Sequence, residues 1–117
     1  MKQRILLVLF LIAVGLPLKA AQVNTSPLAG ARAYPNPWRS DKHANVSIKF
    51  DGIPASSTIK LFTVSGHEVK SLATDSSGLA TWDRTNDGGD LVASGVYIFL
   101  IIDPQGNETS GKLAIIK

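Results

Sequence analysis

Residues 82–100 read WDRTNDGGDLVASGVYIFL and decide the fold that the sequence predicts. Residues 83–90 are turn-forming, because Gly adopts positive φ freely and Asp and Asn side chains bond nearby backbone groups. Ser94-Gly95 marks a second bend. From Val96 to Ile102 the chain is a continuous apolar run of mostly β-branched and aromatic residues, which predicts the most hydrophobic strand of the domain. The segment is therefore expected to be a corner that sets the register of a central strand.

Short strand-like stretches recur on both sides of this corner, and no stretch after residue 22 holds a helical period. They lie at 45–50, 57–64, 67–72, 79–82, 96–102 and 108–117, and an edge or kinked segment precedes them at 31–38. This spacing predicts an all-β fold, an immunoglobulin-like antiparallel β-sandwich of about seven strands. Trp82 and Tyr97 are expected to be apolar anchors on the two sides of the corner.

Two of these strands carry predictions about which side chains face the core. Val46, Ile48 and Phe50 alternate with polar residues, which predicts that all three lie on one buried face. Val69 and Leu72 are expected to point inward from a later strand.

The N-terminus has the pattern of a secretory signal peptide. Lys2 and Arg4 precede an apolar run at 5–16, which Pro17 ends, and two small residues follow at 20–21. A helix over that run would rise about 18 Å, well short of a hydrocarbon core of roughly 30 Å, so no stable membrane span is expected. An uncleaved N-terminal anchor is the alternative.

The sequence thus predicts three regions: a signal peptide at 1–21, a flexible leader at 22–30 and a sandwich domain at 31–117. Export across an inner membrane would place the domain in the periplasm, on the outer cell surface or outside the cell.

Charge and cysteine content exclude several function classes. The formal net charge of +3 includes Lys2, Arg4 and Lys19, and their removal leaves nine basic residues against nine acidic ones. With no basic stripe, no nucleic-acid partner is expected. The chain has no cysteine, so thiol catalysis and cysteine-based metal binding are excluded, and the core alone must hold the exported domain.

Catalytic chemistry is not predicted. His43 and His67 lack the spacing of paired metal ligands, and no serine lies in a G-x-S-x-G motif. We therefore expect no enzyme and no cofactor.

Two binding hypotheses remain open at this point. The acidic loop could offer oxygen ligands to Ca²⁺ from Asp83, Asn86, Asp87 and Asp90, although turn chemistry alone explains these residues. Likewise four aromatic residues could form a platform for sugars, although aromatics at strand ends more often cap a core. These residues are Tyr34, Trp38, Trp82 and Tyr97.

Four segments in order resemble the type IX secretion C-terminal sorting domain and the related Ig-like domain of flagellar hook-capping proteins. Tyr34-Pro35-Asn36-Pro37-Trp38 is similar to the YPNPF/W opening of that family. Residues 59–69, IKLFTVSGHEV with Gly66 at the turn, resemble its IxIFDxxGRxV hairpin. Trp82-Asp83 through Gly95-Val96-Tyr97 resembles its WDGRDxxG…VASGVY signature, and GKLAIIK at 111–117 resembles its terminal strand. The chain departs from the pattern at Thr63, His67 and Arg84, where the family commonly has Asp, Arg and Gly.

The resemblance implies a non-catalytic module for secretion sorting or protein interaction, here without attached cargo. Its partner would be outer-membrane secretion machinery or another exported protein. The C-terminal strand would carry the interaction, through Lys112, Leu113, Ile115, Ile116 and Lys117. The alternative is a freestanding secreted β-sandwich that binds calcium or a glycan.

Overall fold

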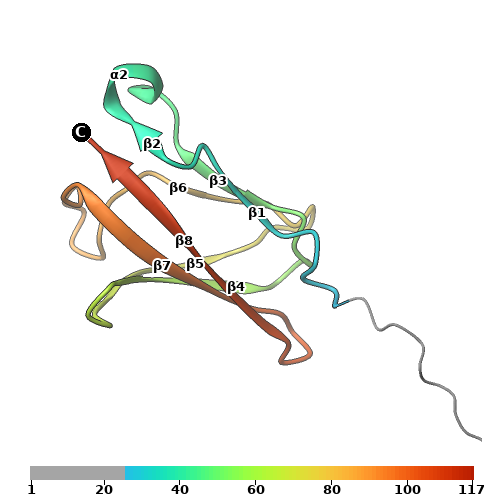
Figure 1. Cartoon of the computed structure of the whole chain (residues 1–117). Helices are drawn as coiled ribbons and strands as arrows, with labels where there is room; N and C mark the ends of the chain where they lie inside the picture. Colours follow the sequence, from blue (N-terminus) through green and yellow to red (C-terminus); the bar gives the residue numbers. More distant parts are fainter. Residues whose placement is uncertain (1–25) are drawn as a thin grey trace, which may run out of the picture.

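The computed structural model describes residues 26–117 as two β-sheets packed face to face (Figure 1). The predicted signal peptide and the first residues of the predicted leader lie outside this range. The helical residues of the described range form no segment that could cross a membrane. One short helix, α2 (Ser40–His43), accompanies eight strands: β1 (Arg32–Tyr34), β2 (Trp38–Arg39), β3 (Ile48–Asp51), β4 (Thr58–Thr63), β5 (Glu68–Ala73), β6 (Ala80–Trp82), β7 (Gly95–Ile102) and β8 (Glu108–Ile116).

One sheet has three strands in the order β1-β3-β6, and the other has five in the order β2-β8-β7-β4-β5. The architecture confirms the predicted all-β sandwich, with β7 as the central strand of the larger sheet. One feature differs from a purely antiparallel sandwich: β2 pairs with β8 in parallel. The predicted kinked segment at 31–38 serves both sheets, because β1 pairs with β3 and the chain then crosses to β8.

Apolar side chains from the inner faces of both sheets form the core. The largest fully buried ones are Trp82, Phe50, Ile48, Ile59, Leu61, Ile101, Leu113 and Ile115. Trp82 of the smaller sheet meets Tyr97 of the larger one edge to face, with ring centroids 5.8 Å apart and an interplanar angle of 71°. Both predicted anchors are therefore buried, and they contact each other across the sandwich.

The prediction that Val46 lies in the core is wrong. Its side chain is 40% exposed, and β3 begins only at Ile48. The backbone of Val46 is engaged in the preceding loop, where its N–H donates to the carbonyl of His43 and its carbonyl accepts from the indole of Trp38. These local bonds end the regular alternation before it reaches Val46.

The inward orientation of Val69 and Leu72 is confirmed. Val69 is buried and Leu72 packs against the core. In a regular strand, residues three apart point to opposite faces. The pairing of β4 with β5 shifts register between Leu61 and Phe62, and this β-bulge brings both side chains to the inner side.

A glycine on β8 makes room for an aromatic ring on β7. Gly111 lies opposite Phe99, and a Cβ added to Gly111 would overlap the Phe99 ring. The ring also packs edge to face on Phe50 of the other sheet, with centroids 5.4 Å apart. Gly111 thus lets Phe99 lie over the strand and still reach the core.

We predict that Gly111→Ala destabilises the domain by about 1–3 kcal/mol, because the added methyl group must displace the packed Phe99 ring. The measurement is thermal or urea unfolding followed by circular dichroism. Gly88→Ala, in an exposed loop where the new Cβ meets only ordinary contacts, is the matched control. Equal stability of Gly111→Ala and wild type would contradict this account of Phe99.

Candidate functional site at the C-terminal strand

The residues predicted for interaction on β8 divide into two groups by burial. Leu113 and Ile115 point into the core, each with only 1% of its surface exposed. Lys112, Ile116 and Lys117 are exposed. The inner side of the strand therefore holds the sandwich together, and only its outer side can contact a partner.

A clamp built from the sequence YPNPW at residues 34–38 fixes the C-terminal half of β8. The Asn36 side chain donates to the carbonyl of Lys112 at 2.9 Å and accepts from the N–H of Ala114 at 3.1 Å. It therefore mimics a neighbouring strand just before Trp38 pairs with Ile115. Proline on either side of Asn36 has no N–H to donate, so the side chain supplies the bonds that the backbone cannot.

Trp38 anchors this clamp to the rest of the domain. Its ring is buried, and its indole N–H donates to the carbonyl of Val46 at 2.7 Å. The Arg84 guanidinium lies over the ring, 3.9 Å from the centroid, in a cation–π contact. Sequence reasoning missed these contacts of Asn36 and Arg84, because both join segments that are far apart in the chain.

The acidic loop is closed by its own turn chemistry. Asp83 Oδ1 accepts from the N–H and the hydroxyl of Thr85, and the hydroxyl bond is the main reason why the pKa of Asp83 is lowered. Asn86 Oδ1 accepts from the N–H groups of Gly88 and Asp90 at 2.9 and 3.0 Å.

Two of the four oxygen donors proposed for calcium, Asp83 and Asn86, are thus already engaged in the turns, while Asp87 and Asp90 are exposed. Within residues 26–117, no three His, Cys, Asp or Glu side chains gather as a metal site would require. Calcium binding therefore stays an untested hypothesis that the geometry does not favour.

The four aromatic residues do not form an exposed platform for sugars. Trp38, Trp82 and Tyr97 are buried, with 3%, 0% and 7% of their surfaces exposed. Tyr34 is the one partly exposed ring of the four, at 38%, and it lies on β1. The described range also contains no pocket.

The two histidines lie in different surroundings. His43 Nδ1 accepts a hydrogen bond from the backbone N–H of Arg39 at 2.9 Å, which closes the turn of α2. His67 is exposed beside the β4–β5 turn.

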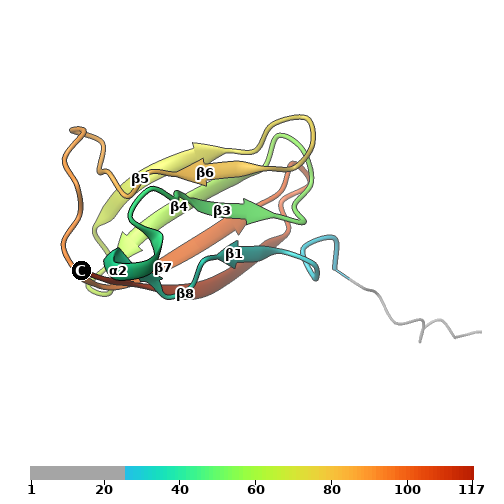
Figure 2. The same cartoon turned by 90° about the horizontal axis from the view of Figure 1, so that it is seen from above.

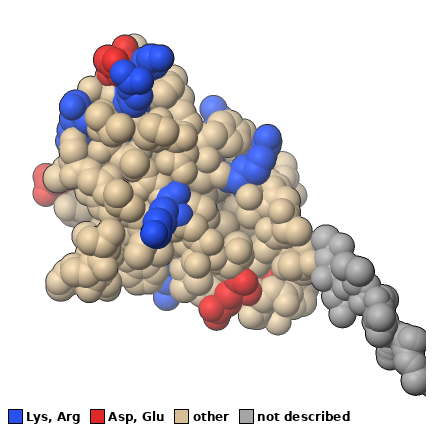
Figure 3. Space-filling model, in the orientation of Figure 1, with Lys and Arg blue, Asp and Glu red and all other residues tan. Residues whose placement is uncertain are grey.

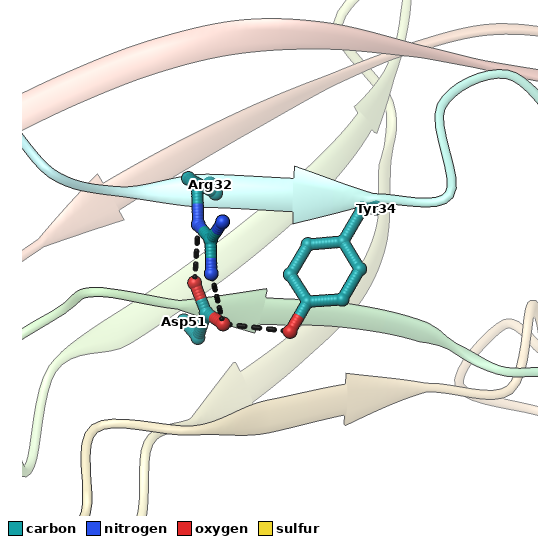
Figure 4. Close-up of polar contacts among 3 residues, drawn as sticks. All are labelled: Arg32, Tyr34 and Asp51. Atoms are coloured by element: carbon teal, nitrogen blue, oxygen red, sulfur yellow. Dashed lines mark hydrogen bonds and ion pairs between the residues drawn. The ribbon is translucent and has the colours of Figure 1, made fainter.

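A surface cluster of three residues joins β1 to β3 (Figure 4). Arg32 binds Asp51 through two nitrogens at 3.0 and 2.9 Å, and the Tyr34 hydroxyl donates to Asp51 at 2.6 Å. The hydrogen bond from Arg32, followed by the one from Tyr34, holds the pKa of Asp51 below its ordinary value. The Asp51 carboxylate accepts from both Arg32 and Tyr34, so the cluster ties β1 to β3 and supports their register.

The comparisons with known proteins include an informative structural likeness. No described protein family matches the sequence, and no curated protein is similar to it. PorZ, an essential bacterial surface component of the type IX secretion system of Porphyromonas gingivalis, superimposes with a TM-score of 0.66 at 25% identity. The match covers 78% of this chain and only 12% of PorZ, so this chain corresponds to a small part of that protein.

Two weaker structural matches carry no weight. Dimeric latent PorU from Porphyromonas gingivalis matches at 23% identity over 74% of this chain and 9% of PorU, with a TM-score of 0.49. CopC from Methylosinus trichosporium matches at 15% identity over 74% of this chain and 93% of CopC, with a TM-score of 0.43.

We predict that Asn36→Ala lowers the free energy of unfolding by about 1–2 kcal/mol, because two backbone groups of β8 lose their partner. Urea unfolding measures the change. Asn45→Ala, at an exposed loop position after α2, is the control and should stay within about 0.5 kcal/mol of wild type. Similar values for both variants would show that the clamp contributes nothing.

Asp51→Asn should remove part of the acid sensitivity of the fold. Because the pKa of Asp51 is lower in the folded state, its carboxylate stabilises the domain above the ordinary carboxyl pKa near 3.9. This stabilisation disappears as the pH falls through the lowered pKa. The difference in melting temperature between wild type and Asp51→Asn should therefore shrink between about pH 5 and pH 2. A difference that stays constant over this range would refute the role of the carboxylate.

Proposed function

We propose that this chain is a non-catalytic, exported β-sandwich that works in type IX secretion as a sorting or protein-interaction module. Its partner is the outer-membrane secretion machinery or another exported protein. The observation that carries the proposal is the likeness to PorZ over 78% of the chain at 25% identity. The four sequence segments that resemble the sorting-domain family support the same assignment.

Several residues that carry the resemblance are buried or lie in turns. The resemblance therefore concerns the fold more directly than any contact with a partner. Trp38, Trp82 and Tyr97 are buried, and Gly95 begins β7 at a φ of 156°. Gly66 lies in the β4–β5 turn with a φ of 95°, where a side chain would be strained. These residues stabilise the fold of the domain. A partner must therefore bind other residues, which are exposed on its surface.

The outer face of the five-stranded sheet is the surface that fits this role. Alternate residues of β7 point away from the core, and all four are apolar: Val96, Ile98, Leu100 and Ile102. Outward faces of sandwich strands are usually polar, so a fully apolar one indicates that another molecule covers it. Figure 3, in the orientation of Figure 1, shows only isolated charged groups on the side of the molecule that faces the viewer.

The exposed residues of the predicted interaction strand continue this surface. Ala114 lies opposite Val96, and Ile116 is 49% exposed at the end of β8. Lys112 lies opposite Ile98 and borders the apolar residues. The contact surface we propose is therefore centred on Val96 and Ile116, with Lys112 and Lys117 at its rim.

A deletion of residues 113–117 cannot test this proposal cleanly, because it also removes Leu113 and Ile115 from the core. Surface substitutions separate recognition from folding. Val96 and Ile116 are 45% and 49% exposed, so Val96→Glu with Ile116→Glu should leave the fold intact.

We predict that this double variant reaches the cell surface or medium at a severalfold lower level than wild type in a host with a type IX secretion system. Fractionation and immunoblotting with an antibody to the domain measure the distribution, and circular dichroism checks the fold. Val64→Glu, at a 68% exposed position in the β4–β5 turn, is the control. Wild-type export of the double variant would refute the proposed surface, and retention of the wild-type chain in the cytoplasm would refute export itself.

A further inference from the structure

The outward side chains of β7 form an apolar stripe on the five-stranded sheet, and a lysine lies on each side of it. The stripe consists of Val96, Ile98, Leu100 and Ile102. Lys60 of β4 lies opposite Leu100, and Lys112 of β8 lies opposite Ile98. Figure 2 shows β7 between β4 and β8. The residue after each lysine is buried in the core, so both lysines point to the outer face, where the stripe lies.

Neither of these lysines is neutralised by an acid of the described residues. Within residues 26–117 both ion pairs join an arginine to an aspartate, so the lysines beside the stripe have no acidic partner there. Glu108 of β8 lies opposite Ile102, at the end of the stripe. Glu68 of β5 lies opposite Phe62, one strand beyond β4. Positive charge therefore lies beside the middle of the stripe, and negative charge lies beside its end at Ile102.

A molecule that covers this stripe must contact its side chains, because the backbone of β7 is already paired. Between Tyr97 and Ile102, β7 pairs with β4 on one side and with β8 on the other. A covering sheet would extend over both lysines and bury their charges, which is costly without acidic partners. A helix is about 10–12 Å wide, and β4 and β8 are roughly 10 Å apart across β7. The two flanks of a helix that lies along β7 are therefore above the two lysines.

We propose that the partner covers this stripe with an amphipathic helix whose apolar side is flanked by aspartate or glutamate residues. The apolar side packs on β7, and the acidic flanks pair with Lys60 and Lys112. From Val96 to Ile102 the stripe is about 20 Å long, which corresponds to a helix of about 14 residues. The end of the helix over Ile102 carries no acid, because Glu108 lies there. This inference rests on the proposed function and specifies the chemistry of its partner.

The charges beside the stripe favour this partner over other apolar ones. Covering the stripe removes water from the lysine side chains next to it, and an acid on each flank compensates for that loss. Each pair of opposite charges strengthens binding by about 1.5- to 5-fold, and each pair of like charges weakens it. A helix flanked by lysine or arginine places like charges on both sides, so it should bind about tenfold more weakly than an acid-flanked helix.

Two synthetic peptides of about 14 residues test this preference. Both have the same apolar stripe and are held helical by the same covalent staple. Glutamates flank the stripe in the acid-flanked peptide, and lysines flank it in the base-flanked peptide. NMR titration measures the binding of each to protein purified after expression of the full 117-residue sequence. We expect the acid-flanked peptide to bind in the micromolar to millimolar range, about tenfold more tightly than the base-flanked one.

Charge reversal beside the stripe should exchange the preference. Lys60→Glu with Lys112→Glu should bind the base-flanked peptide more tightly than the acid-flanked one. Lys60→Gln with Lys112→Gln removes both charges and should bind the two peptides equally. Lys49→Glu, at a half-buried strand lysine of the smaller sheet, is the matched control and should keep the wild-type preference. Urea unfolding followed by circular dichroism checks that each variant is folded.

Equal binding of the two peptides to the wild-type protein overturns the inference, and so does the absence of binding up to about 1 mM. A preference that survives the charge reversal also overturns it, because the peptide then binds elsewhere. The export assay of Val96→Glu with Ile116→Glu separates this inference from the proposed function. Loss of export without peptide discrimination refutes the acidic helix and supports the secretion role. Wild-type export with peptide discrimination refutes the secretion role and supports the site for an acidic helix.

Discussion

The packing of Trp82 on Tyr97 is the contact on which the rest of the domain depends. Two large rings can be buried only if their polar atoms find partners. The corner between them supplies both partners: the Trp82 indole donates to the carbonyl of Thr85 at 2.8 Å, and the Tyr97 hydroxyl donates to the carbonyl of Ala93 at 2.7 Å. The loop between Trp82 and Tyr97 therefore hydrogen-bonds to both rings that it connects. The contact between the rings joins the two sheets without a disulfide.

The loop between Trp82 and Tyr97 also contacts residues at both edges of the larger sheet. The N–H of Asp87 donates to the carbonyl of Val69 at 3.0 Å and so covers part of the outer edge of β5. Arg84 covers Trp38, which positions β2 on β8. Arg84 has a φ of 65°, a conformation that glycine adopts without strain. The sorting-domain family that the sequence resembles commonly has glycine at this position. In this chain Arg84 has a strained backbone conformation, and its side chain makes a cation–π contact with Trp38.

The sequence was sufficient for those features that depend on local chemistry. Alternation and turn residues located the strands, and the apolar run at 96–102 identified β7 as the central strand. Features that depend on contacts between distant segments were not accessible. Nothing local shows that Asn36 bonds to a strand more than 70 residues later, or that Val46 is held in a loop by Trp38. Likewise the terminal strand is amphipathic, and only its pairing shows that Leu113 and Ile115 face the core.

The two edges of the larger sheet are partly protected from pairing with other strands. Unpaired edges invite non-specific pairing, and most proteins cover or charge them. Here Asp87 covers part of the β5 edge, Asn36 and β2 cover half of the β8 edge, and Glu108 and Lys112 charge the remainder. The outward side chains of β7 are all apolar, although charged residues of β4 and β8 lie opposite three of them: Lys60, Glu108 and Lys112. β7 is thus apolar on both sides, and this is the basis of the contact surface that we propose.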